Sequence, residues 1–105
     1  MNSALPAPRP AETDPVLAEL RARVSEIDRA ILEAVNQRLE LVEEIGRHKK
    51  AAGLPAHDPH REESMLRALQ QANRGKLTAE GVAELQASIL YLTKRQLGIA
   101  AAVNR

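Results

Sequence analysis

The feature that most constrains this chain is one long helical segment without a break. Asp14 followed by Pro15 is a helix start signal, because aspartate caps the first turn and proline suits the first helical position. No proline interrupts the pattern before Gly53, which supplies a C-terminal stop. The sequence therefore predicts a helix of about 38 residues, roughly 57 Å long at the rise of an α-helix.

Two shorter helices follow the long one. Asp58 and Pro59 repeat the start signal, and the pattern predicts a helix to about Arg74. Thr78 is the predicted cap of a third helix, which we expect to continue to about Ala101. The predicted fold class is all-α, with three helices in the chain.

The apolar side chains of the long segment alternate at spacings of three and four. They form one stripe: Leu17, Leu20, Val24, Ile27, Ile31, Ala34, Leu41 and Ile45. A second stripe lies beside it: Leu32, Val35, Leu39 and Val42. Two shorter helices of the same chain cannot cover a helix of this length on both stripes. The geometry therefore predicts a homodimer, and we expect an intertwined homodimeric helical bundle.

Composition narrows the choice of partner and location. The chain contains no cysteine, and its net charge of +1 is spread over interspersed acidic and basic residues. The absence of cysteine excludes disulfides and thiolate metal sites. The mixed charge distribution does not favour nucleic acid or an anionic membrane as a partner. Residues 1–13 are rich in proline and alanine, so we expect a disordered tail before a helical domain over residues 14–105. With no apolar run long enough for a signal peptide or a membrane span, we expect a cytoplasmic protein.

Two polar residues fall where the helical register calls for apolar ones. Arg38 lies in the main stripe of the long segment. Gln96 lies in the corresponding stripe of the third segment: Val82, Leu85, Ile89, Leu92, Gln96 and Ile99. Either residue alone can be explained as a polar core residue that fixes the register of the helices, as in coiled coils. Together, on different helices, they indicate a polar pocket inside the bundle, because an unpaired buried polar group is costly.

Further charged residues share faces with that pocket. Arg38, Val42, Ile45 and Lys49 are spaced four, three and four, and Asp58, Arg61 and Glu62 begin the second helix. Lys49 is also explained as a helix-end cation, Asp58 as an N-cap and Glu62 as a first-turn acid. Taken together, these residues indicate a site for a small dianion, with the aliphatic side chains of Val42 and Ile45 beneath it. His57 and His60 lack a third ligand and are a weak zinc signal, so no metal is expected.

The motifs resemble those of the all-helical (type II) chorismate mutase family. The run L-R-x-x-V-x-x-I-D-x-x-I-L begins at Leu20, and N-x-R-x-E-L, I-G-x-x-K and D-x-x-R-E begin at Asn36, Ile45 and Asp58. The resemblance covers roughly Leu17 to Leu97. It implies a cofactor-free enzyme of aromatic amino-acid or related shikimate-derived biosynthesis, which rearranges chorismate to prephenate.

The resemblance also implies a role for each site residue. Arg38 would bind one substrate carboxylate, and Arg21 of the second protomer would bind the other. Lys49 and Gln96 would donate to the ether oxygen from opposite sides. Glu62, helped by Asp58 and Arg61, would hold the ring hydroxyl. Arg21 and Arg38 are seventeen residues apart, roughly 25 Å on a straight helix. If both bind one small ligand, they must therefore come from different chains.

One position departs from the family pattern. Many members have a serine one turn before the glutamine, where this chain has Leu92. A register shifted by one residue would put Thr93 on the serine and Leu97 on the glutamine. We expect the register with Gln96, because that residue lies in the predicted stripe. Three alternatives remain: a 4-amino-4-deoxychorismate mutase of antibiotic biosynthesis, an isochorismate pyruvate lyase and a non-catalytic dimeric helical adaptor.

Overall fold

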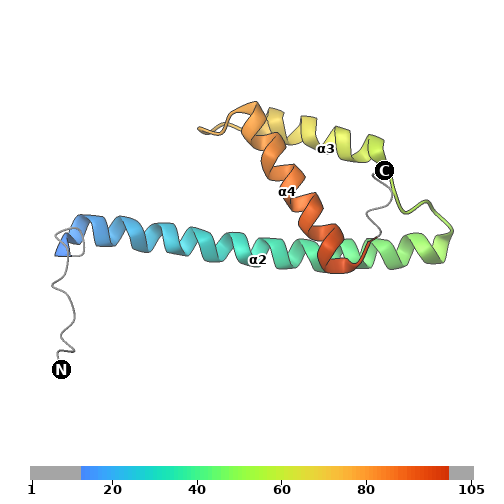
Figure 1. Ribbon diagram of the computed structural model, residues 1–105, viewed down its shortest axis with the longest axis horizontal. Coiled ribbons are helices and arrows are strands. Elements are labelled where there is room, and N and C mark those ends of the chain that lie inside the picture. The colour runs from blue at the N-terminus through green and yellow to red at the C-terminus, as the bar shows by residue number, and fades with distance from the viewer. Residues whose placement is uncertain (1–12, 100–105) are drawn as a thin grey trace, which may run out of the picture. The chain divides into compact units, whose positions relative to one another are not determined.

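The computed structural model describes residues 13–99 and contains three helices and no strands in that range (Figure 1). The helices are α2 (Pro15–Ala52), α3 (Pro59–Ala72) and α4 (Ala79–Leu97). The predicted all-α class with three helices, one of them very long, is confirmed for this part of the chain. Of the predicted N-terminal tail, residues 1–12 lie outside the described residues.

Helix α2 begins and ends at the residues that the sequence indicates. The Asp14 Oδ1 atom accepts hydrogen bonds from the backbone N–H of Val16 (2.9 Å) and of Leu17 (3.1 Å). At the other end Gly53 adopts a left-handed φ of 70°, and the N–H of Leu54 donates to the carbonyl of Lys49 at 2.8 Å. A side chain at Gly53 would be strained in this conformation, so glycine is the residue that allows the chain to turn away from the helix.

Helices α3 and α4 are capped in the same way and pack against each other. The Oγ1 atom of Thr78 accepts from the N–H of Gly81 at 2.9 Å, which starts α4 as predicted. Helix α4 ends at Leu97 rather than near Ala101, so the predicted end was wrong. The cause is Gly98, which takes a left-handed φ of 69° and closes the last turn on the carbonyls of Lys94 and Arg95.

The chain divides into two compact units, residues 1–36 and residues 37–105. The first unit holds the N-terminal part of α2, and the second holds the C-terminal part of α2 together with α3 and α4. Only three side chains between residues 13 and 99 are buried: Val82, Gln86 and Thr93. All three belong to α4, so the second unit is organised around one face of that helix.

The face of α4 that is buried differs from the predicted stripe. Val82, the first residue of the predicted stripe, is buried as expected, but Gln86 and Thr93 are buried in place of Leu85 and Leu92, which are exposed. Both sets have helical spacing, and beyond Val82 the buried positions are offset by one residue from the predicted ones. Packing against the neighbouring helices of the same chain selects the face with the two polar residues, and the more apolar face of α4 is left uncovered.

No helix among residues 13–99 is long and apolar enough to cross a membrane.

Candidate active site

A cavity of about 250 Å³ lies within the second unit, where the C-terminal part of α2 meets the start of α3 and the end of α4. Its lining combines charged side chains with a few aliphatic ones: Arg38, Val42, Lys49, Ala56, His57, Asp58, Arg61, Glu62, Leu90, Thr93, Lys94 and Ile99. The volume lies just below the range of roughly 300–1,000 Å³ that is usual for pockets of drug-sized ligands, so the cavity suits a small metabolite.

Arg38 is held in this cavity by a threonine of α4. Its Nη1 atom donates to Thr93 Oγ1 at 2.7 Å, and Thr93 Oγ1 in turn donates to the carbonyl of Ile89 at 2.7 Å. Thr93 is only 6% exposed, so the contact is shielded from solvent. A guanidinium has five N–H donors, and the bond to Thr93 uses one of them. The bond to Thr93 holds the side chain in place, and its remaining N–H groups can bind a ligand.

Lys49 occupies the last turn of α2 and connects the helix to the loop that follows it. Its Nζ atom donates to the carbonyl of Ala56 at 3.3 Å, and its own carbonyl accepts from Leu54. An ammonium carries three donors, so this contact leaves two for a ligand. Lys49 is half-buried, which distinguishes it from the exposed Lys50 beside it.

The start of α3 places three more charged residues at the cavity. Asp58 is the N-cap of this helix, and its Oδ1 atom accepts from the backbone N–H of Arg61 at 3.1 Å. Pro59 occupies the first helical position, so the cap and the proline together determine where α3 begins and which residues form its first turn. Asp58, Arg61 and Glu62 all line the cavity as a consequence.

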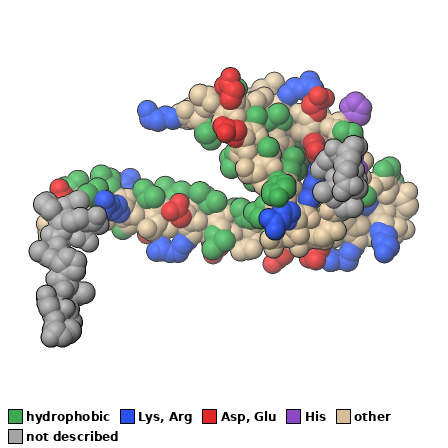
Figure 2. Space-filling view, in the orientation of Figure 1, with side chains coloured by type: hydrophobic (Ala, Val, Ile, Leu, Met, Phe, Trp, Pro, Cys, Tyr) green, Lys and Arg blue, Asp and Glu red, His purple; other side chains and the backbone are tan. Residues whose placement is uncertain are grey.

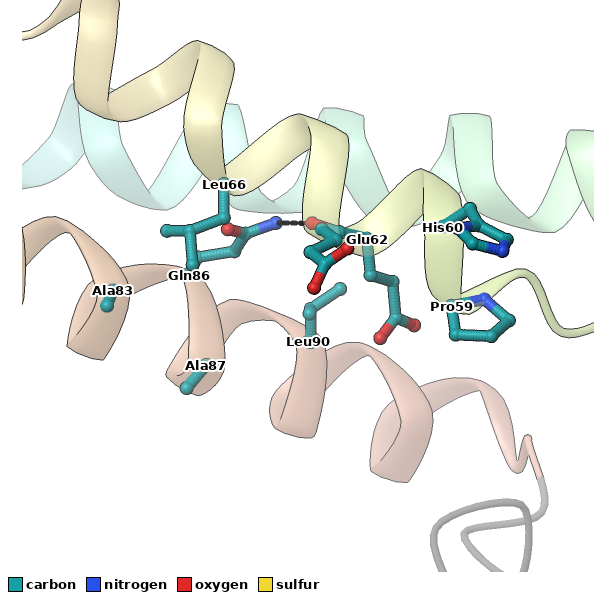
Figure 3. A pocket seen from close by; sticks show the side chains of 9 residues that line it. Pro59, His60, Glu62, Leu66, Ala83, Gln86, Ala87 and Leu90 are labelled. Atoms are coloured by element: carbon teal, nitrogen blue, oxygen red, sulfur yellow. Dashed lines mark hydrogen bonds between the residues drawn. The ribbon is translucent and has the colours of Figure 1, made fainter.

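Glu62 is fixed from α4 at two points. The Lys94 Nζ atom lies 3.6 Å from Glu62 Oε2, and Gln86 Nε2 donates to the Glu62 carbonyl at 3.4 Å (Figure 3). A second cavity of about 520 Å³ between α3 and α4 also has Glu62 and Leu90 in its wall. Glu62 therefore borders both cavities, whereas Lys94 lines only the smaller of the two.

The charges of the smaller cavity favour an anion. Four cationic side chains and two carboxylates line it, which gives a net charge of +2 when His57 is neutral. The cations come from all three helices: Arg38, Lys49, Arg61 and Lys94. A ligand with two carboxylates would neutralise this excess, and Val42, Leu90 and Ile99 would contact its apolar part. The arrangement is suited to binding and orienting a small dicarboxylate.

Five of the seven predicted site residues meet at this cavity: Arg38, Lys49, Asp58, Arg61 and Glu62. Arg21 lies in the other unit, on the N-terminal part of α2, and is exposed. Gln96 is exposed on α4 and is not among the lining residues. The prediction gave Thr93 only as the alternative to Leu92, and it did not include Lys94. The spacing of Gln86, Thr93 and Leu97 was the available signal for this face of α4.

The two histidines beside the site lie at different cavities. His57 lines the smaller one and His60 the larger one. Within residues 13–99 no group of three histidine, aspartate or glutamate side chains is placed to hold a metal ion.

Comparison with known protein families finds one match that extends over most of the chain. The model of the family described as chorismate mutase type II matches residues 20–96. The matched region contains all three helices except the first residues of α2 and the last residue of α4.

Curated proteins and solved structures show the same likeness. The chain is 30% identical to the T-protein of Haemophilus influenzae over 86 residues, which are 78% of this chain and 23% of that protein. It is 41% identical over 59 residues to the 4-amino-4-deoxychorismate mutase of Streptomyces pristinaespiralis, covering 56% of this chain and 46% of that protein. The chain thus spans less than half the length of these curated relatives. A structure of chorismate mutase from Thermus thermophilus superposes with a TM-score of 0.70 at 38% identity, over 73% of this chain and 96% of that one.

Proposed function

The chain belongs to the chorismate mutase type II family, and we propose on this premise that it rearranges chorismate to prephenate. The observation that carries the proposal is the cavity with a net charge of +2, in which Arg38, Lys49 and Glu62 meet. Chorismate has two carboxylates, a ring hydroxyl and an apolar ring. The cavity offers cations for the carboxylates, a carboxylate for the hydroxyl and aliphatic side chains for the ring.

The reaction is an intramolecular Claisen rearrangement, in which the ether C–O bond breaks as a new C–C bond forms. No atom passes to the protein, so we assign no nucleophile, metal or cofactor to it. The protein accelerates it by holding the enolpyruvyl arm over the ring. It also stabilises the negative charge that develops on the ether oxygen. Arg38 binds one carboxylate with the donors that Thr93 leaves available, and Lys49 donates to the ether oxygen.

The second donor to the ether oxygen depends on the register of α4. The bond between Arg38 and Thr93 supports the register in which Thr93 takes the place of the family serine. In that register Leu97, which cannot donate, takes the place of the glutamine. Lys49 would then be the main donor to the ether oxygen. The role predicted for Gln96 stays a prediction, and it can be tested by comparing Gln96→Ala with Thr93→Ala.

We propose that the functional form is a homodimer of intertwined chains. The support is the apolar stripe of α2, in which six large side chains are roughly half exposed or more in the single chain: Leu20, Val24, Ile27, Ile31, Leu41 and Ile45. Figure 2 shows hydrophobic side chains gathered along the N-terminal part of this helix. So long an exposed apolar face is unusual for a monomer, and a second copy offers a self-complementary cover.

Dimerisation also supplies Arg21 to the site. Arg21 and Arg38 lie on one continuous helix, seventeen residues apart, so a small ligand held by Arg38 is out of reach of Arg21 of the same chain. We therefore propose that Arg21 acts in trans and binds the second carboxylate. Each active site would then contain residues from both protomers.

One assay distinguishes the proposed function from its rivals. Purified protein is incubated with chorismate, isochorismate and 4-amino-4-deoxychorismate, and the products are separated by chromatography. We expect prephenate from chorismate. Release of pyruvate from isochorismate, with no prephenate from chorismate, would identify a lyase. A dimer that neither converts nor binds any of the three would be an adaptor. The predicted cytoplasmic location is tested separately, by fractionation of cells.

A further inference from the structure

Lys94 is a charged residue of the cavity for which the family resemblance gives no role. Its side chain is 15% exposed, and its Nζ atom lies 3.6 Å from Oε2 of Glu62, whose side chain is 32% exposed. The pair joins α4 to α3, and both residues line the smaller cavity. It differs from the pair between Arg67 and Glu63, which lies on one helix with both side chains about two-thirds exposed. Lys94 and Glu62 thus form a partly buried ion pair at the site.

The pair determines what Glu62 can accept. Of the two carboxylates at the cavity, Asp58 already caps α3 by accepting from the backbone of Arg61. Glu62 is therefore the carboxylate best placed to accept a hydrogen bond from a neutral or cationic substituent of a ligand. Such a substituent would lie close to Lys94 as well, because Lys94 and Glu62 are in contact.

A hydroxyl and an ammonium differ in how they satisfy this pair. A hydroxyl has one donor and two acceptor sites, so it can donate to Glu62 and accept from Lys94 at the same time. An ammonium has only donors. It cannot accept from Lys94, so the two cations would compete for the Glu62 carboxylate, and it would bring a second positive charge close to Lys94, where partial burial strengthens the repulsion.

We infer that Lys94 is a specificity residue that selects a dicarboxylate with a ring hydroxyl over one with a ring ammonium. The inference rests on the proposed mutase function and names its substrate class. The overall charge of the cavity agrees with it, because a net charge of +2 matches a dianion better than a ligand whose ammonium cancels one carboxylate. The relative named as a 4-amino-4-deoxychorismate mutase makes the distinction a practical one.

The test measures kcat/KM for chorismate and for 4-amino-4-deoxychorismate with the full-length chain. We expect the wild type to prefer chorismate by at least tenfold. Lys94→Met removes the charge and keeps the length of the side chain, and we expect it to reduce this preference by tenfold or more. Lys94→Arg, which retains a cation, should keep most of the preference. Lys76→Met, an exposed substitution in the α3–α4 loop, is the matched control and should leave the ratio unchanged.

The outcomes separate this inference from the function on which it rests. A wild type that prefers the amino substrate overturns the inference, and so does a folded Lys94→Met enzyme whose ratio stays within twofold of the wild type. Both results leave the mutase function in place. A wild type that converts neither substrate contradicts the mutase function, and the inference fails with it. If Lys94→Met does not fold, the inference is still overturned by a wild type that prefers the amino substrate, or by a Lys94→Arg enzyme that loses the preference for chorismate.

Discussion

The two parts of α2 carry the same apolar periodicity but are covered to different extents. In the N-terminal part, Val24, Ile27 and Ile31 are all more than half exposed. In the C-terminal part, Arg38 and the second-stripe residues Leu39 and Val42 are partly covered, and Arg38 is hydrogen-bonded to α4. The main-stripe residues of this part, Leu41 and Ile45, stay more than half exposed. The apolar pattern therefore determines which face of the helix is hydrophobic, but it does not determine which chain covers that face. In the C-terminal part the second stripe finds its cover in its own chain, whereas the main stripe of both parts is largely exposed and is the face that we assign to the proposed dimer.

The largest effect is expected from a charge on the uncovered part. Ile27→Asp would place a carboxylate in the apolar contact that we assign to the dimer, and burying an unpaired charge is strongly unfavourable. We expect loss of the dimer together with nearly all activity, measured by analytical ultracentrifugation and by prephenate formation. Ser25→Asp introduces the same charge about half a turn away on the helix and should leave the dimer intact.

For the wild type, the same reasoning predicts an unfolding midpoint that rises with protein concentration. A monomer mass with a midpoint independent of concentration would contradict the dimer.

The next prediction joins the two parts of α2 through the site. Arg21→Ala and Arg38→Ala should each lower kcat/KM on the order of a hundredfold or more, because truncating one partner of a charge pair costs about 2–5 kcal/mol. When the two variants are mixed under exchange conditions, half of the dimers become heterodimers with one intact site. Activity should then return to about a quarter of the wild-type value.

Heterodimers that form but stay inactive would show that Arg21 does not act in trans.

A smaller effect is expected at the contact that covers Arg38. Thr93→Ala removes the acceptor of the Arg38 hydrogen bond, and we expect KM to rise about tenfold, since a hydrogen bond to a charged group contributes about 1.5–3 kcal/mol. Thr93→Ser keeps the hydroxyl and should restore most of the affinity. Gln96→Ala is the comparison on the exposed face of α4 and should change the rate little. A hundredfold loss for Gln96→Ala with a mild Thr93→Ala would instead support the register with Gln96.

The smallest effect is expected at a helix cap outside the cavity lining. Thr78→Ala removes the acceptor for the N–H of Gly81 and should lower the free energy of unfolding by about 1 kcal/mol. Activity should be unchanged, because Thr78 does not line the smaller cavity. Chemical denaturation and steady-state kinetics on the same preparation measure both quantities. A clear fall in activity would indicate that the start of α4 affects the site.

The helices could be predicted from the sequence because their limits depend on local chemistry. Asp14, Asp58 and Thr78 cap the helices that follow them, and Gly53 ends the first. The grouping of charged residues at the end of α2 and the start of α3 was predictable for the same reason, since helical spacing alone places Arg38 and Lys49 on one face.

The orientation of α4 could not be predicted, because two of its faces have helical spacing. Leu85 and Leu92 made one face more apolar and therefore the stronger candidate for burial. Tertiary packing buries Gln86 and Thr93 instead, where each makes a hydrogen bond to another helix of the chain. A prediction based on hydrophobicity alone ranks such a face second. Lys94 was missed for the same reason.

The two short bonds of Thr93 fix more than its position. Its Oγ1 lies 2.7 Å from the carbonyl oxygen of Ile89. A carbonyl oxygen can only accept, so the hydroxyl of Thr93 must be the donor of this hydrogen bond. The single proton of the side chain is thus committed to its own helix, and only lone pairs face the guanidinium of Arg38. Thr93 therefore cannot donate to a bound anion unless that bond breaks. At this end of the cavity a carboxylate would be recognised through nitrogen donors, and exchanging the hydroxyl for a thiol or a methyl would act on the ligand only through Arg38.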